Sequence, residues 1–91
     1  MIHIRVLFRN PQGTIVDGGI DFDLTSFAGQ VPLIGDMILD PGVPQGLDRN
    51  LPQNRQVWTV VGRVFNPRDT EDCVALIVET RDGNVVDEAF L

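Results

Sequence analysis

Apolar and polar residues alternate at the start of the chain, where residues 2–9 place an apolar side chain at every even position. A two-residue period is that of a β-strand with one buried face. The tetrapeptide NPQG that follows, residues 10–13, favours a hairpin loop with Gly13 in the left-handed region. Residues 2–24 are therefore predicted to form an antiparallel hairpin.

The register of this hairpin follows if Asn10 pairs with Thr14. Apolar residues then meet across the strands in three pairs: Phe8 with Val16, Ile4 with Ile20, and Ile2 with Phe22. The other face becomes a ladder of polar residues: His3 opposite Asp21, with Arg5 and Arg9 near Asp17 and Asp21. Gly18 and Gly19 interrupt the second strand, and they predict a bulge or a sharp bend there.

The segment VPLIGDMIL, residues 31–39, combines a proline and a Gly-Asp pair with a short apolar run. Pro32 has no amide hydrogen and favours an edge or a corner, and Asp36 is expected to accept local backbone hydrogen bonds. We therefore expect a loop, a corner and then a short strand. Residues 40–56 follow with three prolines, two glycines and no sustained period, and they predict a long loop that is either functional or mobile.

The strongest strand signals are VWTVVGRVF, residues 57–65, and CVALIVET, residues 73–80, which a polar turn joins into a hairpin. Both faces of this hairpin are apolar, which predicts cover on both faces, wholly or in part. One face is expected to fill the core: Trp58, Val60, Val64, Val74, Leu76 and Val78. The other face is the candidate interaction patch, because uncovered apolar surface commonly marks a contact: Val57, Val61, Phe65, Ala75 and Ile77.

The tetrapeptide RDGN, residues 81–84, is typical of a hairpin turn, so that residues 84–91 either return as a final strand or lie as a tail. A tail that docks through Phe90 would cover the candidate patch. The sequence leaves both arrangements open. If the patch is free, we expect the chain to be dimeric or bound to a partner, and Phe65→Asp to disrupt that association.

No segment shows a helical period beyond a turn, and the 91 residues are expected to form one domain. Short strands with glycine bend points, such as Gly62, favour a small coiled barrel over a two-sheet sandwich. The predicted fold class is therefore all-β, with five or six strands in a strongly bent barrel.

The order of a hairpin, VPLIGDMIL, a long loop, VWTVVGRVF, a turn and CVALIVE resembles many small SH3-like barrels of bacterial proteins. In those barrels a proline, a Gly-Asp pair and a short apolar strand precede two central strands. The resemblance covers most of the chain. It implies an SH3-like barrel fold and hardly any function.

A second resemblance concerns activity. GDMIL, the proline-rich loop and VWTVV are similar to the opening strands of endoribonuclease toxins of the small-barrel class. The Arg-Pro pair that those toxins carry before the second strand is missing, and the N-terminal hairpin is extra. The net charge of −6 also disfavours binding to the phosphate backbone of RNA.

Composition narrows the classes of function. Thirteen carboxylates against seven arginines repel phosphate backbones and anionic lipid, so we expect no nucleic acid and no membrane as a partner. Cys73 is the single cysteine and cannot form an internal disulfide, and one cysteine with one histidine gives no usual metal-ligand set. The N-terminus lacks the pattern of a signal peptide, and we expect a cytoplasmic protein.

The chemically active residues have adequate structural explanations. His3 could act as a general base oriented by Asp21, but no nucleophile is predicted on its face, and Cys73 is expected to be a small buried hydrophobe. Asp21 and Asp23 could serve as paired carboxylates or bind a hard cation, but alternating acids are typical of the solvent-exposed face of a strand. Calcium-loop spacing is absent around the long loop: Asp36, Asp40 and Asp48. PGVP, residues 41–44, fits the PxxP ligand pattern, but turn formation explains it as well. We therefore assign no catalytic, cofactor-binding or metal-binding residue.

The sequence favours a non-enzymatic module that binds a protein partner, or a second copy of itself as a dimer, through the candidate patch and residues 40–56. One alternative is a small hydrolase or nuclease that uses the loop acids with Arg49 or Arg55. Another is a subunit of a larger assembly, for instance one encoded by a mobile element. A nuclease needs acids and arginines that converge beside a cleft, whereas a binding module needs exposed apolar surface.

Overall fold

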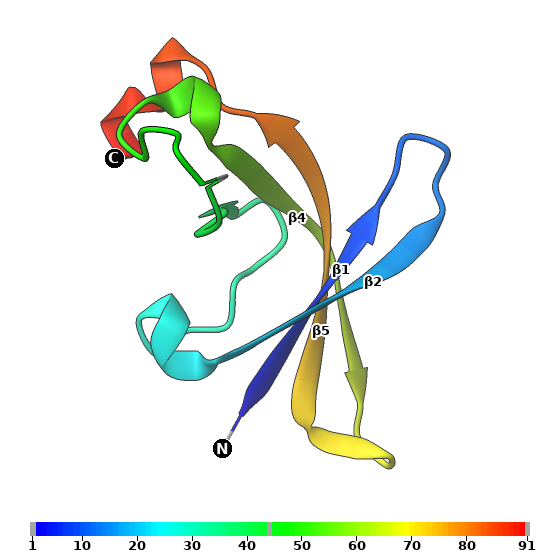
Figure 1. Cartoon of the computed structure of the whole chain (residues 1–91). Helices are drawn as coiled ribbons and strands as arrows, with labels where there is room; N and C mark the ends of the chain where they lie inside the picture. Colours follow the sequence, from blue (N-terminus) through cyan, green and yellow to red (C-terminus); the bar gives the residue numbers. More distant parts are fainter. Residues whose placement is uncertain (1, 44, 91) are drawn as a thin grey trace.

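The computed structural model describes residues 2–43 and 45–90 (Figure 1). Within these residues the strands are β1 (His3–Arg9), β2 (Ile15–Asp23), β3 (Met37–Leu39), β4 (Gln56–Asn66) and β5 (Thr70–Asp82). Short 3-10 helices accompany them: η1 (Leu24–Phe27), η2 (Pro52–Asn54) and η3 (Val85–Phe90). Strand is the main regular structure, which confirms the all-β prediction.

The strands form one sheet in the order β2-β1-β5-β4-β3. Neighbouring strands are antiparallel, except that the central strands β1 and β5 are parallel. In the described part of the chain, β2 and β3 are the two edges and do not pair with each other. The sheet is therefore strongly twisted but not closed (Figure 1).

The N-terminal hairpin has the predicted turn and a shifted register. The amide of Asn10 donates to the carbonyl of Thr14 at 3.0 Å, and Gly13 has a φ of 88°. Phe8 lies opposite Val16, as predicted. From Val6 toward the N-terminus the predicted register is wrong, because two glycines of β2 have no partner: Val6 lies opposite Ile20, Ile4 opposite Phe22, and His3 opposite Asp23.

These glycines form the predicted bulge. A Cβ on Gly18 would overlap the ring of Phe8, with its Cδ2 at 2.8 Å. Gly19 adopts a φ of 70°, which glycine tolerates without strain. The bulge thus lets the Phe8 ring lie against β2, and it moves the later pairs by two positions. A shift of two keeps every side chain on its own face, so the apolar face survives.

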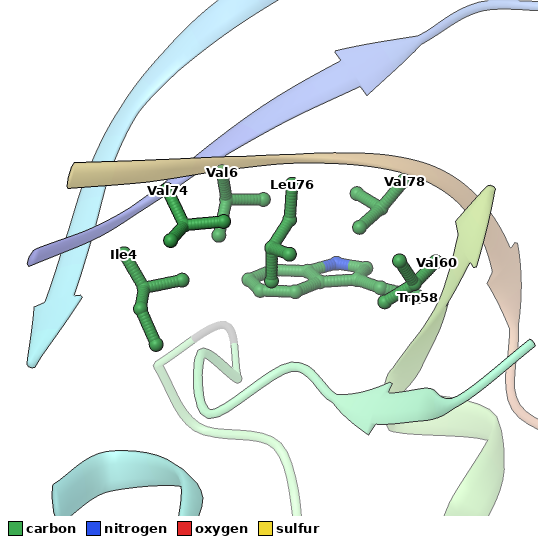
Figure 2. Close-up of a cluster of buried hydrophobic side chains, with 7 residues drawn as sticks. All are labelled: Ile4, Val6, Trp58, Val60, Val74, Leu76 and Val78. Atoms are coloured by element: carbon green, nitrogen blue, oxygen red, sulfur yellow. The ribbon is translucent and has the colours of Figure 1, made fainter. Parts of the chain in front are cut away.

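The core lies on one face of the sheet (Figure 2). Its fully buried side chains come from β1, β4 and β5: Ile4, Val6, Trp58, Val60, Val74, Leu76 and Val78. Figure 2 shows the side chains of β1 and β5 directed toward the indole of Trp58. Residues of η1, of the connection to β3 and of β3 itself pack against this cluster: Leu24, Phe27, Val31 and Ile38.

Strand β4 carries a second bulge, at Val61. The residues before and after it pair with Val78 and Ile77, so that Val61 itself has no partner. Because directly opposite residues share a face of the sheet, the extra residue reverses the side of every later residue in β4. Val64 was predicted in the core, and this prediction is wrong: it lies on the other face, 47% exposed.

The segment VPLIGDMIL forms the predicted loop, corner and short strand. The carboxylate of Asp36 accepts a hydrogen bond from the amide of Leu33 at 2.7 Å, which is the expected role of this aspartate. Gly35 has a φ of 95° at the corner, and its amide donates to the carbonyl of Val60 at 2.8 Å. The stretch therefore positions β3 at the edge of the sheet.

Candidate functional site

The face of the sheet opposite the core is called the outer face. At its centre Leu7 of β1 lies beside Ile77 of β5, and Val64 of β4 lies beside Ala75 of β5. These apolar residues define the outer strip: Leu7, Val64, Ala75 and Ile77. Val64 is exposed and the other three are half-buried.

The structure divides the predicted interaction patch. Ala75 and Ile77 belong to the outer strip. Val57 shares the outer face but is only 1% exposed. Phe65 is 58% exposed and lies on the core side of the sheet, because the bulge at Val61 reverses β4. The five residues therefore do not share one face.

Two residues of the outer strip, Leu7 and Val64, were missing from the predicted patch. Leu7 interrupts the polar series on the outer face of β1, and this interruption is the signal in the sequence that points to it. Val64 has no such signal, because its side of the sheet depends on the bulge at Val61.

Ion pairs flank the outer strip. Arg5 binds Asp17 across β1 and β2, in agreement with the predicted ladder. Arg9 instead approaches Glu79 of β5, with Nη2 at 3.2 Å from Oε2. Hydrogen bonds from the amide of Gly19 and from Arg5 hold the pKa of Asp17 below its ordinary value. Exposed pairs of this kind add little stability, but they neutralise the two arginines that flank the strip.

The outer strip lies at the centre of the sheet, on the parallel pair and the neighbouring strand β4. Antiparallel sheets commonly leave one face to water, and that face is then polar. Toward the core β1 and β5 are both apolar, but on the outer face β5 places Ala75 and Ile77 whereas β1 places only Leu7, between Arg5 and Arg9. Figure 1 shows η1 and the connection to β3 on one side of these crossing strands, which is the core side.

The C-terminal segment reaches one end of the outer face. It forms η3 and is therefore a tail and not a final strand. Phe90 shares a small hollow of about 230 Å³ with Val57 and with residues of β3: Met37 and Leu39. Val57 is buried there, while Phe90 remains 47% exposed. Of the described residues, the tail thus protects the Val57 end of the face and leaves the outer strip open.

Asp87 attaches this tail to the sheet. Its carboxylate accepts hydrogen bonds from Arg81 Nη1 at 2.7 Å, from Arg81 Nη2 at 2.8 Å and from the amide of Asn84 at 2.8 Å. The hydrogen bonds from Arg81 have the largest effect and that from Asn84 the next: together they lower the pKa of Asp87 from 3.8 to about 2, against the opposing effect of desolvation. RDGN therefore contains the last two residues of β5 and the start of the tail, and the predicted hairpin turn at this position is wrong.

We expect Asp87→Asn to destabilise the protein at neutral pH and the difference from wild type to disappear in acid. A carboxylate whose pKa is lowered by folding contributes stability above its unfolded pKa, and that contribution is lost as the pH falls toward the folded pKa. The difference should therefore be complete above about pH 4 and vanish near about pH 2. Urea denaturation across this range measures it, with Glu88→Gln as the control for one lost charge. A difference that does not change with pH would contradict the role of the ion pair.

Chemically active residues of β1, β2 and β5 share a hollow of about 450 Å³. It is lined by His3, Arg5, Asp21, Asp69, Thr70, Asp72 and Cys73. In the described residues Arg5 is bound to Asp17, and no hydrogen bond joins it to the acids of this hollow. Among the residues that the structure describes, no cluster of histidine, cysteine and acidic side chains could hold a metal ion. The hollow gathers titratable groups without the contacts of a catalytic set.

The other carboxylate candidates stabilise turns. Asp23 caps η1 by accepting from the amides of Thr25 at 3.0 Å and Ser26 at 3.3 Å, and a hydrogen bond from the Thr25 hydroxyl lowers its pKa. The loop acids act in the same way: Asp36 accepts from Leu33, Asp40 from Gly42 at 2.8 Å, and Asp48 from Asn50 at 2.9 Å. These local bonds account for the position of each carboxylate.

Arg55 organises the long loop of residues 40–56. It is 9% exposed, and its guanidinium donates to the carbonyl of Asp40 at 3.0 and 3.3 Å and to the carbonyl of Arg49 at 3.1 Å. Because these acceptors belong to the backbone, Arg55 stabilises the loop. Among the described residues no ion pair joins Arg55 to an acid, whereas the hydrolase alternative needs an arginine that acts together with the loop acids. The PGVP pattern ends on Pro44, outside the described residues.

Among the described residues, no helix combines the length and the apolar character needed to cross a membrane. Comparison of the chain with protein-family models, with curated proteins and with solved structures finds no match.

Proposed function

We propose that this chain is a non-catalytic interaction module that binds a folded protein through its outer strip. The observation that supports this most is the outer strip, an apolar group at the centre of the face that the described chain leaves uncovered. A partner that presents a flat apolar surface would remove the strip from water and gain about 25 cal/mol per Å². The two arginines beside the strip are already paired with Asp17 and Glu79, so a partner that covers them does not need to supply counter-charges.

A subunit of a larger assembly is one form of this proposal, since such a subunit also requires an apolar docking face. The hydrolase and endoribonuclease alternatives receive less support, because Arg5 and Arg55 are engaged with Asp17 and with backbone carbonyls.

The SH3-like barrel also remains a proposal. The strong twist of the sheet and its single core support it, and pairing of β2 with β3 would be needed to close it. A cytoplasmic location remains an expectation from the sequence.

Photo-crosslinking inside the cells that make this protein tests the proposed function. A benzophenone amino acid at Val64, on the outer strip, should give a discrete covalent adduct with a protein. The same amino acid at Val86 on η3, which is 77% exposed, should not give that adduct and serves as the control. If Val64 gives no adduct, or the same adducts as Val86, the outer strip is not a binding surface.

A further inference from the structure

We infer that the partner of the outer strip is a second copy of this chain, related by a twofold axis that runs parallel to β1 and β5 between the two outer faces. This inference rests on the proposed function and names the partner of that surface. It follows from the register of the parallel pair and from the charges beside it.

The register makes the outer strip self-complementary. A twofold axis parallel to the strands, midway between β1 and β5, places β1 of one copy over β5 of the other. Rotation about this axis leaves the position of each residue along the strand direction unchanged. Leu7 lies beside Ile77 in its own chain, and it therefore lies over Ile77 of the second copy. Arg5 likewise lies over Ala75 of the second copy. The same contacts form twice, which is the property of an isologous dimer interface.

The charges beside the outer strip are also complementary to themselves under this twofold rotation. Arg9 and Glu79 lie side by side in one chain, at the next outward-facing positions of β1 and β5. The twofold axis places each of them over the opposite charge of the second copy. Two facing sheets pack about 10 Å apart, a gap that long arginine and glutamate side chains span from both sides. The arrangement therefore forms a closed ring of alternating charges beside the apolar centre.

Pairing through the edge strand β2 is less favourable for two copies. β2 carries Asp17, Asp21 and Asp23, and edge-to-edge pairing would bring these acids of both copies together. The net charge of −6 adds repulsion wherever the facing surfaces are not balanced. Beside the outer strip Arg5 pairs with Asp17 and Arg9 pairs with Glu79, so the charges at this position favour a face-to-face sandwich of two sheets.

Sedimentation equilibrium with charge reversals tests the inference. The wild type should form a dimer whose dissociation constant rises roughly tenfold or more in Arg9→Glu and in Glu79→Arg, because each change creates two like-charge contacts across the interface. A mixture of these two variants should dimerise again, since every charge at position 9 of one chain then meets the opposite charge at position 79 of the other. The double variant Arg9→Glu/Glu79→Arg should also dimerise. Circular dichroism confirms that each variant is folded.

Arg68→Glu is the matched control, because it makes the same change of charge in the turn between β4 and β5 and should leave the dissociation constant unchanged. A wild type that sediments as a monomer at its highest soluble concentration would overturn the inference. So would a mixture of the two single variants that stays monomeric. The Val64 adduct separates the two proposals: an adduct with twice the mass of the chain supports both, whereas an adduct with a different protein supports the proposed function and overturns the dimer.

Discussion

Trp58→Ala is expected to lower the free energy of unfolding by about 3–5 kcal/mol, the largest loss from any single substitution in this fold. Trp58 is 1% exposed, and its ring contacts Phe8 and Phe22 at centroid distances of 5.3 and 6.4 Å. Strands held by hydrogen bonds on both sides cannot close the cavity that the indole leaves. Within the described residues the indole Nε1 is buried without an acceptor, which reduces the net gain from Trp58 but does not reverse it.

Urea denaturation followed by circular dichroism measures this loss, because the variant lacks the only tryptophan and its fluorescence. Phe65→Ala is the matched control, an aromatic residue of the same strand that is 58% exposed. It should cost less than about 1 kcal/mol, mainly through the lost contact with the guanidinium of Arg63, which lies 5.2 Å from its ring. Equal losses at Trp58 and Phe65 would contradict the exposed position of Phe65 at the end of β4.

Gly83→Ala is expected to cost roughly 2 kcal/mol or more, although Gly83 lies outside the core. Its amide donates to the carbonyl of Arg55 at 2.8 Å, which holds the end of β5 against η2. An added Cβ would overlap the carbonyl oxygen of Pro52 and lie 3.0 Å from that of Arg55. Both are backbone atoms and cannot rotate away, so either η2 or the tail must move.

Hydrogen exchange and urea denaturation together measure this effect. The amides of η3 should exchange faster in Gly83→Ala, and the midpoint of unfolding should fall. Gly42→Ala is the control, since its Cβ would meet only the side chain of Asp40 at 3.2 Å. We expect that control to stay within about 0.5 kcal/mol of wild type. If both variants behave alike, the tail is not packed on η2 through Gly83.

Local chemistry explains what was predictable from the sequence. The turn at Asn10, the bulge at Gly18 and the corner at Asp36 each depend on residues within a few positions of one another, and all three are confirmed. The periods of the strands likewise come from neighbouring residues, and they identified most of the core. Interactions that are short in sequence leave a pattern that can be recognised without coordinates.

The features that the sequence did not predict depend on contacts between segments that are distant along the chain. Nothing near β1 indicates that it pairs in parallel with β5, and this pairing is what makes Leu7 part of an apolar strip. The bulge at Val61 lies in a run of valines whose two faces look alike, so the sequence did not reveal the reversal that moves Phe65 to the core side. The hydrolase alternative named Arg55, and the sequence contains no sign of its role in the loop, because its acceptors are carbonyls, which every residue carries.

The relaxation of side-chain methyl groups by a soluble paramagnetic chelate tests most directly whether the chain leaves its outer strip bare. The sample is methyl-labelled and dilute enough to be monomeric. The account predicts strong relaxation enhancement of the methyl groups of Leu7, Val64 and Ile77. It predicts little enhancement for those of Val6 and Leu76, which are fully buried. Enhancement at the first three as weak as at Val6 and Leu76 would show that the chain covers this face itself, and would contradict the account.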